Sequence, residues 1–281
     1  MHVAHPHAPL SSTQGVTYHE HDFSTSLTPL FLDLKPDIVI STTSGGIYET
    51  QKAAIDSAIE AEIPRFVPAE FGHDSLNTKL QSRLPPSRER ARTIEYLQQQ
   101  AKDGGVQWVA FATGATLDRG LLSGNMGIDL KWQSATLHGE GHERFPASSS
   151  PWIGRVMLAV IEHWQEVKNE YIYASGMTIS ANEVIAGLEQ ETGKTFEVGR
   201  ADVEQCVYEA ERRLTSGFPD AGMFLMERSV LYDEDMNAVG PFDQHDAKDR
   251  LGLKPENLHD IIHGVLHDEK HHGGKPGCGC D

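Results

Sequence analysis

Apolar positions in the first half of the chain follow two alternating spacings. Short, mainly apolar runs at 37–41, 64–68 and 106–112 are typical of strands buried inside a sheet. Between these runs, apolar residues recur every three or four positions in 47–59 and in 91–101, which predicts a helix after each of the first two strands. The order strand, helix, strand, helix, strand predicts a doubly wound α/β fold with a parallel sheet.

The second half of the chain has shorter and more mixed patterns. Ser180 and Glu183 have the spacing of a capping box, so we expect a helix to begin there. Further strands are predicted at 134–138 and 171–174, and further helices at 151–168, 202–214 and 256–270. This half is therefore expected to form a smaller mixed α+β region packed against the sheet.

Charge and composition narrow the class of protein. The net charge is −17, from 24 Lys and Arg against 41 Asp and Glu, which disfavours nucleic-acid and membrane-surface binding. No apolar run approaches the roughly 20 residues that cross a bilayer, and the first residues lack the pattern of a secretory signal. Three cysteines in 281 residues exclude a disulfide scaffold. We therefore expect a cytoplasmic globular protein that binds a small molecule.

Five segments, in this order, resemble one known family: 37–46, 63–74, 106–121, 141–157 and 177–197. The family is the NmrA-like and isoflavone-reductase-like branch of the atypical short-chain dehydrogenases, and the similarity extends over about residues 15–265. The resemblance implies an NAD(P)H-dependent reductase of a small carbonyl or enone compound in secondary metabolism, with NADP(H) preferred over NAD(H). It also leaves a second interpretation open, a non-catalytic member of the NmrA-like branch that senses a dinucleotide and acts through a protein partner.

The start of the sequence departs from this family. Its members open with a strand, a glycine-rich turn that approaches the cofactor pyrophosphate, and a helix. Here the first glycine is Gly15, just before the segment that resembles the third strand of the family. We therefore expect a Rossmann-like nucleotide-binding region at 1–133 that is incomplete at its N-terminus, a substrate region at 134–270 and a flexible tail at 271–281. A longer parent protein would supply the glycine-rich turn upstream of Met1.

A second departure concerns the catalytic position. Reductases of this family carry a lysine on the helix that follows the strand matching 64–68. The matching position in this sequence is Arg90. A guanidinium stays protonated at physiological pH, so it cannot pass a proton to a substrate, although it can stabilise an oxyanion. Lys79 is a possible substitute if the turn returns it to the site.

The resemblance also assigns binding residues. Thr42, Thr43 and their neighbours form a small-residue turn after a buried strand, where hydroxyls can meet ribose or phosphate. By resemblance, the cofactor-binding residues are Asp22 near the adenine, Ser41, Thr42 and Thr43 along the adenosine, and Pro68, Glu70, Phe71 and Gly72 beside the nicotinamide ribose. The substrate-binding residues are Thr113, Gly114, Ala115 and Leu117.

Two other groups of residues have both a chemical and a structural interpretation. Glu70 and His73 could form an acid–base pair, but a histidine near a turn is more often solvated or capping. Histidines recur every fourth residue from His259 to His271, before Cys278 and Cys280, which is compatible with a metal site. A solvated helix face explains the same pattern, so we assign no metal. Homodimer formation is left open.

Overall fold

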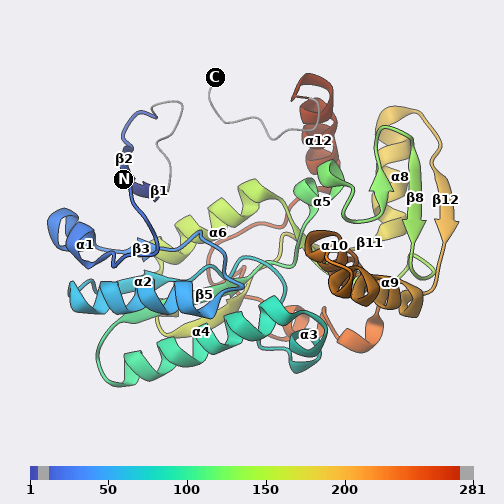
Figure 1. Ribbon diagram of the computed structural model, residues 1–281. Helices are drawn as coiled ribbons and strands as arrows, with labels where there is room; N and C mark the ends of the chain where they lie inside the picture. The colour runs from blue at the N-terminus through green and yellow to red at the C-terminus, as the bar shows by residue number, and fades with distance from the viewer. Residues whose placement is uncertain (6–12, 273–281) are drawn as a thin grey trace.

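The computed structural model describes residues 1–5 and 13–272. At its centre lies a parallel four-stranded sheet in the order β10-β5-β4-β3 (Figure 1). Its strands are β3 (Val39–Ile40), β4 (Arg65–Val67), β5 (Gln107–Ala112) and β10 (Glu170–Tyr173). The predicted α/β class with a parallel sheet is confirmed, because each strand is joined to the next by a crossover that contains a helix.

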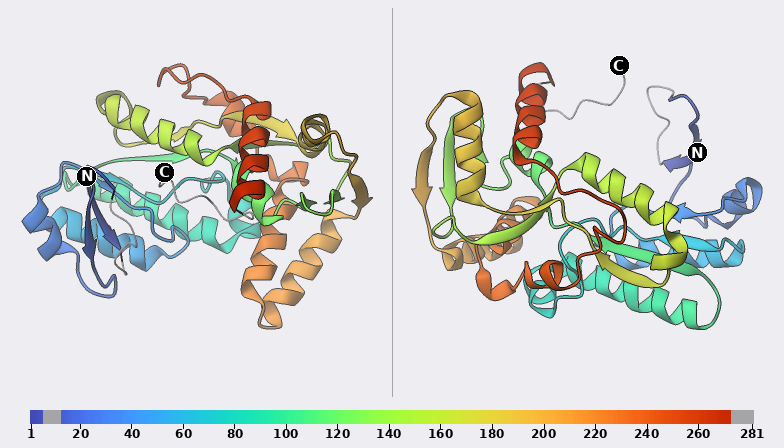
Figure 2. Two further views of the ribbon diagram at one scale, coloured as in Figure 1. Left: turned by 90° about the horizontal axis from the view of Figure 1, so that it is seen from above. Right: turned by 180° about the vertical axis from the view of Figure 1, so that it is seen from behind.

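Helices cover both faces of this sheet. One face packs against α1 (Thr28–Leu34), α2 (Tyr48–Glu60) and α4 (Pro85–Lys102), and the other against α6 (Ser150–Glu162) and α7 (Trp164–Val167). Figures 1 and 2 show α2 and α4 on one side of the sheet and α6 on the other. Trp108 and Phe111 of β5 are both almost fully buried and point into these two different cores, as alternation along a strand requires.

The rest of the chain forms two smaller three-stranded sheets with a core of their own. Their strands are β6 (Ala115–Thr116), β9 (Arg144–Ser148) and β11 (Met177–Ser180) in one, and β7 (Ile128–Asp129), β8 (Ser134–Leu137) and β12 (Glu197–Arg200) in the other. The packed helices are α5 (Leu117–Ser123), α8 (Ala181–Thr192) and α12 (Leu258–His272). The capping box predicted for Ser180 and Glu183 is present at the start of α8.

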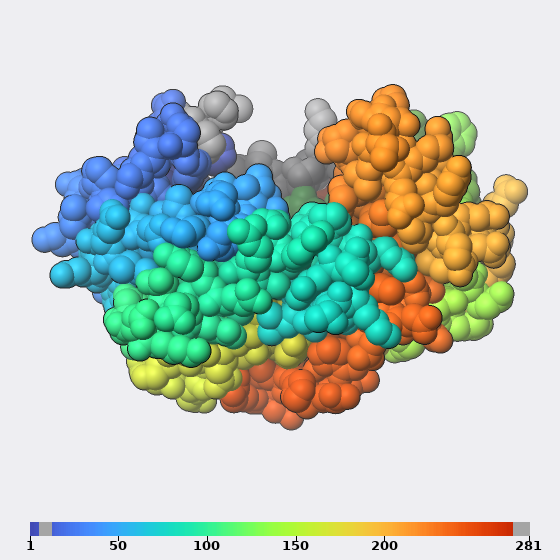
Figure 3. Space-filling view, turned by 60° about the horizontal axis from the view of Figure 1, so that its bottom comes forward, coloured from blue at the N-terminus to red at the C-terminus, as the bar shows by residue number. Residues whose placement is uncertain are grey.

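Two helices that pack against each other stand apart from these layers. They are α9 (Val203–Thr215) and α10 (Pro219–Val230), and α10 meets α3 (Thr78–Arg83) through a small apolar cluster. The short elements η1 (Glu234–Met236) and α11 (Gly240–Gln244) follow. In Figure 3 this hairpin, in orange, faces the first helices, in blue, and the surface between them is hollowed.

The predicted division at residue 133 separates elements that pack together. Both α6 and β10 follow residue 133, yet α6 covers the large sheet and β10 pairs with β5. The physical reason is that β5 needs a hydrogen-bonded neighbour on its second side, which a later segment of the chain provides.

The first strands form a separate two-stranded parallel sheet. It consists of β1 (His2–His5) and β2 (Thr17–Glu20), and only the second of these was predicted. The tail predicted at 271–281 lies outside the described residues from 273 onward, while 271 and 272 belong to α12. Among the described residues, no helix is both long and apolar enough to span a membrane.

Candidate active site

Three turns lie side by side at the carboxyl ends of β3, β4 and β5. The Ser41 amide donates to the Val67 carbonyl at 2.8 Å, and the amides of Thr113 and Gly114 donate to the Gly72 carbonyl at 3.0 and 2.9 Å. These bonds fix the turns to one another. The edge where parallel strands end is the usual ligand-binding edge of an open α/β sheet.

Gln51, a buried residue of α2, connects the first two turns. Its amide nitrogen donates to the hydroxyls of Ser41 at 2.9 Å and Thr43 at 2.8 Å, and its carbonyl accepts from the Ala69 amide at 3.2 Å. Two of the hydroxyls predicted to meet the cofactor therefore also hold the turn in place. Nothing in the sequence pattern distinguished Gln51, because a glutamine on a helix is most often solvated.

A cleft of about 600 Å³ opens beside these turns. One wall consists of residues from the three turns and Arg90 of α4, and the opposite wall comes from α5, the loop after it and α10. Gly45 allows the first two turns to approach: a Cβ there would lie 2.0 Å from the Ala69 carbonyl oxygen and 2.9 Å from Arg90 Nε. Any side chain at this position would displace one of the two.

Several polar atoms in the cleft wall have no protein partner. Six buried side-chain polar atoms of the described residues lack a hydrogen bond, and three of them belong to residues of this wall: His73 Nδ1, Arg90 Nε and Asn125 Oδ1. A buried polar group without a partner costs free energy, roughly 1–3 kcal/mol, so such groups concentrate where a ligand completes them. This concentration marks the cleft as the candidate active site.

The charged residues that line the cleft are mostly basic, although the protein as a whole is acidic. Of the residues that the structure describes, three arginines, Arg90, Arg119 and Arg228, line it, against a single carboxyl group, that of Glu227. Burial raises the pKa of Glu227, and the nearby Arg90 guanidinium opposes that rise. Burial and the same guanidinium lower the pKa of His73 to about 4, so this histidine is neutral at physiological pH.

Glu70 lies behind the wall and does not line the cleft. Its carboxylate accepts a hydrogen bond from the Tyr171 hydroxyl at 3.0 Å, and that hydroxyl in turn accepts from the Ser75 amide at 3.1 Å. Burial raises the pKa of Glu70 to about 7, although Arg90 pulls it down. Glu70 and His73 therefore do not act on a common proton, and the acid–base pair considered from sequence is not formed.

The structure brings some of the predicted binding residues together and separates others. Thr43, Phe71, Gly72, Arg90, Gly114 and Ala115 line the cleft. Ser41, Pro68 and Thr113 are buried directly behind it, while the Thr42 side chain is exposed. Whether the lining residues contact a ligand stays a prediction.

Two predicted contacts do not fit the geometry. Leu117 is fully buried in the core of the smaller sheets, because α5 turns it away from the cleft, so its assignment to the substrate pocket is corrected. Asp22 is also outside the cleft, and its exposed carboxylate accepts hydrogen bonds from the amide and hydroxyl of Ser24.

Lys79 and the histidine series are likewise away from the cleft. The Lys79 ammonium donates to the Asp235 carbonyl at 2.6 Å, so it does not replace the family's lysine. His259, His263, His267 and His271 all lie on α12 with exposed side chains. In the described part of the chain, no group of three or more ligating side chains has the arrangement of a metal site. Cys278 and Cys280 lie outside the described residues.

The opposite wall of the cleft was not predicted from the sequence. Glu227, Arg228 and Phe224 come from α10, which was not predicted as a helix. A signal was available, because Pro219 and Asp220 are typical of a first helical turn. Arg228 anchors the helix by donating to the Asn125 carbonyl at 2.7 Å and the Gly124 carbonyl at 3.1 Å.

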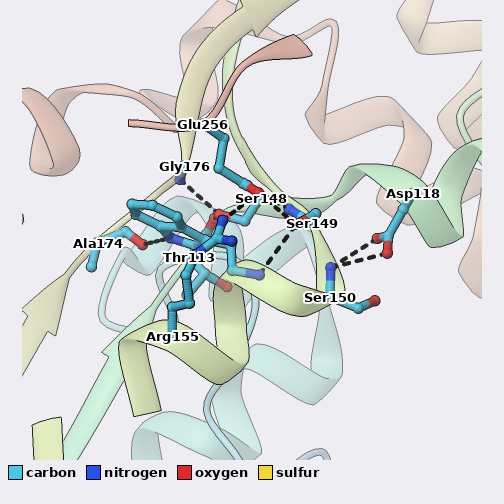
Figure 4. A network of polar contacts seen from close by, with 10 residues as sticks. Thr113, Asp118, Ser148, Ser149, Ser150, Arg155, Ala174, Gly176 and Glu256 are labelled. Atoms are coloured by element: carbon cyan, nitrogen blue, oxygen red, sulfur yellow. Dashed lines mark hydrogen bonds and ion pairs between the residues drawn. The ribbon is translucent and has the colours of Figure 1, made fainter. Parts of the chain in front are cut away.

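A second cavity, of about 650 Å³, lies between α6, α12 and the segment before α12. Here the buried polar groups satisfy one another, as Figure 4 shows. Glu256 accepts from the Ser149 amide at 2.8 Å, from its hydroxyl at 2.5 Å and from Arg155 at 2.9 Å. Ser148 donates to the Thr113 carbonyl at 2.6 Å, which supports the floor of the first cleft from behind. This network is structural.

Two fungal proteins are similar to the chain in sequence, while no profile of a known protein family matches it. Oxidoreductase aprR of Aspergillus flavus is 33% identical over 182 residues, covering 64% of this chain and 61% of that protein. Oxidoreductase poxI of Penicillium oxalicum is 23% identical over 236 residues, covering 82% of this chain and 74% of that protein. The chain thus spans 61% of the length of aprR.

Solved structures with a similar fold include several reductases. Leucoanthocyanidin reductase from Vitis vinifera, in a binary complex with NADPH, has a TM-score of 0.71 at 15% identity, covering 95% of this chain and 91% of that one. An isoflavone reductase has a TM-score of 0.68 at 17% identity, covering 94% and 89%. A complex of AtPrR2 with NADP+ and (+)pinoresinol has 0.68 at 16% identity, covering 89% and 82%.

This chain has the isoflavone-reductase-like fold. The Rossmann-like class predicted from the five segments is confirmed, and the fold is the one that the resemblance implied. Within this fold, the cleft lies at the carboxyl ends of the parallel strands, and Arg90 faces it from α4. The missing glycine-rich turn stays a prediction about a longer parent.

Proposed function

We propose that the chain is an NADP(H)-dependent reductase of a small carbonyl or enone compound. The observation that carries the proposal is the Arg90 guanidinium, which lines a cleft at the ends of three parallel strands. The names of the fungal relatives as oxidoreductases, and the NADPH and NADP+ complexes among the solved structures, support the reaction class and the cofactor.

The cleft residues fit a nicotinamide and its ribose. Gly45 has no side chain, so the turn after β3 can lie against Ala69 and Arg90. Beside it, the Ser44 hydroxyl lines the cleft and makes no hydrogen bond within the described residues. When bound, the cofactor supplies a hydride to the substrate carbon. Thr43, Ser44 and Gly72 would hold the ribose side of this group, and Gly114 and Ala115 would face the substrate.

Arg90 would act on the substrate oxygen. As the carbonyl carbon is reduced, negative charge develops on its oxygen, and a fixed cationic donor stabilises that charge more than it stabilises the neutral carbonyl. Arg90 therefore orients and stabilises, but it does not supply the proton.

Titration of the purified chain with NADPH and NADH, by calorimetry and thermal shift, tests the proposal. We expect micromolar binding of NADPH, weaker binding of NADH, and NADPH oxidation with carbonyl probes such as 4-nitrobenzaldehyde and chalcone. Arg90→Met should lower kcat on the order of 100-fold while NADPH affinity stays within a few-fold. Lys79→Met removes a lysine outside the cleft and is the matched control. A well-folded chain that binds neither dinucleotide would overturn the proposal.

One observation favours the second candidate, a dinucleotide-sensing protein without catalytic activity. Arg90 stands where the family's reductases carry a lysine, so the residue expected to move a proton is absent. Tight binding of NADPH without oxidation by any probe would support this candidate, whereas steady turnover would exclude it.

A further inference from the structure

Among the described residues, Glu227 is the one carboxyl group in the cleft wall, and it is held in a defined position. Its Oε2 accepts a hydrogen bond from Asn125 Nδ2 at 3.2 Å. The neighbouring Arg228 ties the same turn of α10 to the carbonyls of Gly124 and Asn125. These bonds hold Glu227 against the loop that follows α5. Glu227 lines the cleft from α10, and Arg90 lines it from α4.

The charged and titratable groups around Glu227 leave it as the proton source of the cleft. Three of these groups are arginines, Arg90, Arg119 and Arg228, and a guanidinium is a poor proton donor, although burial lowers the pKa of Arg228. Arg119 Nε already donates to the Ser150 hydroxyl at 3.2 Å. His73 is neutral, with a pKa of about 4. Burial raises the pKa of Glu227 against the opposing effect of Arg90, so its carboxyl group holds a proton to higher pH than an exposed glutamate does.

We propose that Glu227 is the general acid of the reduction, an inference that rests on the proposed reductase function. Hydride adds to the substrate carbon, and the electron pair of the carbonyl double bond moves to the oxygen, where Arg90 stabilises it. The O–H bond of the Glu227 carboxyl group then breaks, and its proton forms the new O–H bond of the product. The resulting carboxylate lies near the Arg90 guanidinium and regains a proton from water.

This division of labour accounts for the arginine at the catalytic position. A lysine can both stabilise an oxyanion and release a proton, whereas an arginine does only the first. A separate acid facing the same cleft restores the second role. The same step serves an enone, because hydride addition at the β carbon places the electron pair on the same oxygen.

Glu227→Gln tests the proposal, because the amide oxygen can still accept from Asn125. With NADPH and 4-nitrobenzaldehyde, we expect kcat to fall on the order of 100-fold or more, while the Kd of NADPH stays within about threefold. The fall in kcat with rising pH that marks deprotonation of the acid in the unmodified chain should disappear. Glu227→Asp, which keeps the acid one methylene shorter, should recover part of the rate.

Asp220→Asn is the matched control, since it removes an exposed carboxylate from the same helix. Its kcat and pH profile should equal those of the unmodified chain. If Glu227→Gln keeps its melting temperature, its kcat and the same pH profile while the unmodified chain turns over, Glu227 is not the acid and the reductase function stands. If the unmodified chain binds no NADPH or oxidises none, the reductase function itself fails.

Discussion

Two cavities of this molecule have similar volumes, about 600 and 650 Å³, but their polar groups are arranged differently. Around Glu256, the donors and acceptors of α6 and of the segment before α12 pair with one another. In the cleft beside Arg90, buried donors and acceptors have no protein partner. Both regions lie close to the Thr113–Gly114 turn. Ser148, beside the cavity around Glu256, donates to the Thr113 carbonyl, and Gly114 forms part of the wall of the cleft.

This difference indicates which of the two cavities is suited to binding a ligand. A paired network contributes to stability and has little left to offer a small molecule, whereas an unpaired donor lowers stability until a ligand completes it. Volume alone would not have distinguished the two cavities. The comparison predicts that substitutions around Glu256 change stability, whereas substitutions in the cleft change ligand binding and turnover.

Glu256→Ala should have the largest effect on stability. It removes the acceptor for the Ser149 amide and hydroxyl and leaves Arg155 unpaired, so we expect the free energy of unfolding to fall by about 3 kcal/mol. Urea unfolding measures this change. Arg155→Ala, at the half-exposed end of the same pair, is the control and should cost about 1 kcal/mol or less. Equal losses in the two variants would contradict the structural role given to Glu256.

Gly45→Ala should have an intermediate effect on stability and should also weaken the cleft. The new Cβ would lie 2.0 Å from the Ala69 carbonyl oxygen, so the turns must separate and Arg90 must move. We expect a loss of about 2 kcal/mol in unfolding experiments, with NADPH bound more weakly at a temperature where the variant is folded. Gly154→Ala, on the surface of α6 where a Cβ meets nothing within 4 Å, is the control: it should raise stability by up to about 1 kcal/mol and leave NADPH binding unchanged.

The effect of Glu70→Gln on stability should depend on pH and should be almost absent at pH 4. The folded chain keeps the Glu70 proton up to about pH 7, whereas an unfolded glutamate releases it near 4.5. The folded state therefore binds more protons between these values, and the stability of the unmodified chain falls as pH rises through this window.

The Gln variant does not undergo this loss, so at pH 8 it should be more stable than the unmodified chain by up to about 3 kcal/mol, and at pH 4 by almost nothing. Urea unfolding at both pH values measures the difference. Glu95→Gln, an exposed change on α4, is the control. A gain of equal size at both pH values would show that burial of the charged form is not the cause.

Local pattern was enough to predict the parallel sheet and the helices between its strands. The β-branched residues of β3 and the apolar spacing of α2 and α4 act within a few positions of one another, so a short window of sequence contains the information. The same held for the capping box of α8. The family resemblance placed Arg90 at the site, and the structure agrees that it lines the cleft.

The opposite wall depended on contacts that no short window contains. Glu227 lies 137 positions after Arg90 in the printed sequence, and only the packing of the α9–α10 hairpin opposite the sheet places both in one cleft. Leu117 is the opposite case. The resemblance assigned it to the substrate pocket, but the direction of α5 turns its side chain into the core.

The sequence by itself determined the fold class and the absence of a glycine-rich turn from residues 1–281, and the resemblance predicted Arg90 at the position of the family's lysine. The tertiary structure decided which polar groups are left without partners. That property depends on the burial and direction of each side chain relative to distant segments, and hydrogen bonds form or fail over fractions of an ångström. Arg90 and Glu256 are both charged side chains in the sequence, and only the folded chain shows that the first lines the cleft with its Nε unpaired while the second is fully engaged.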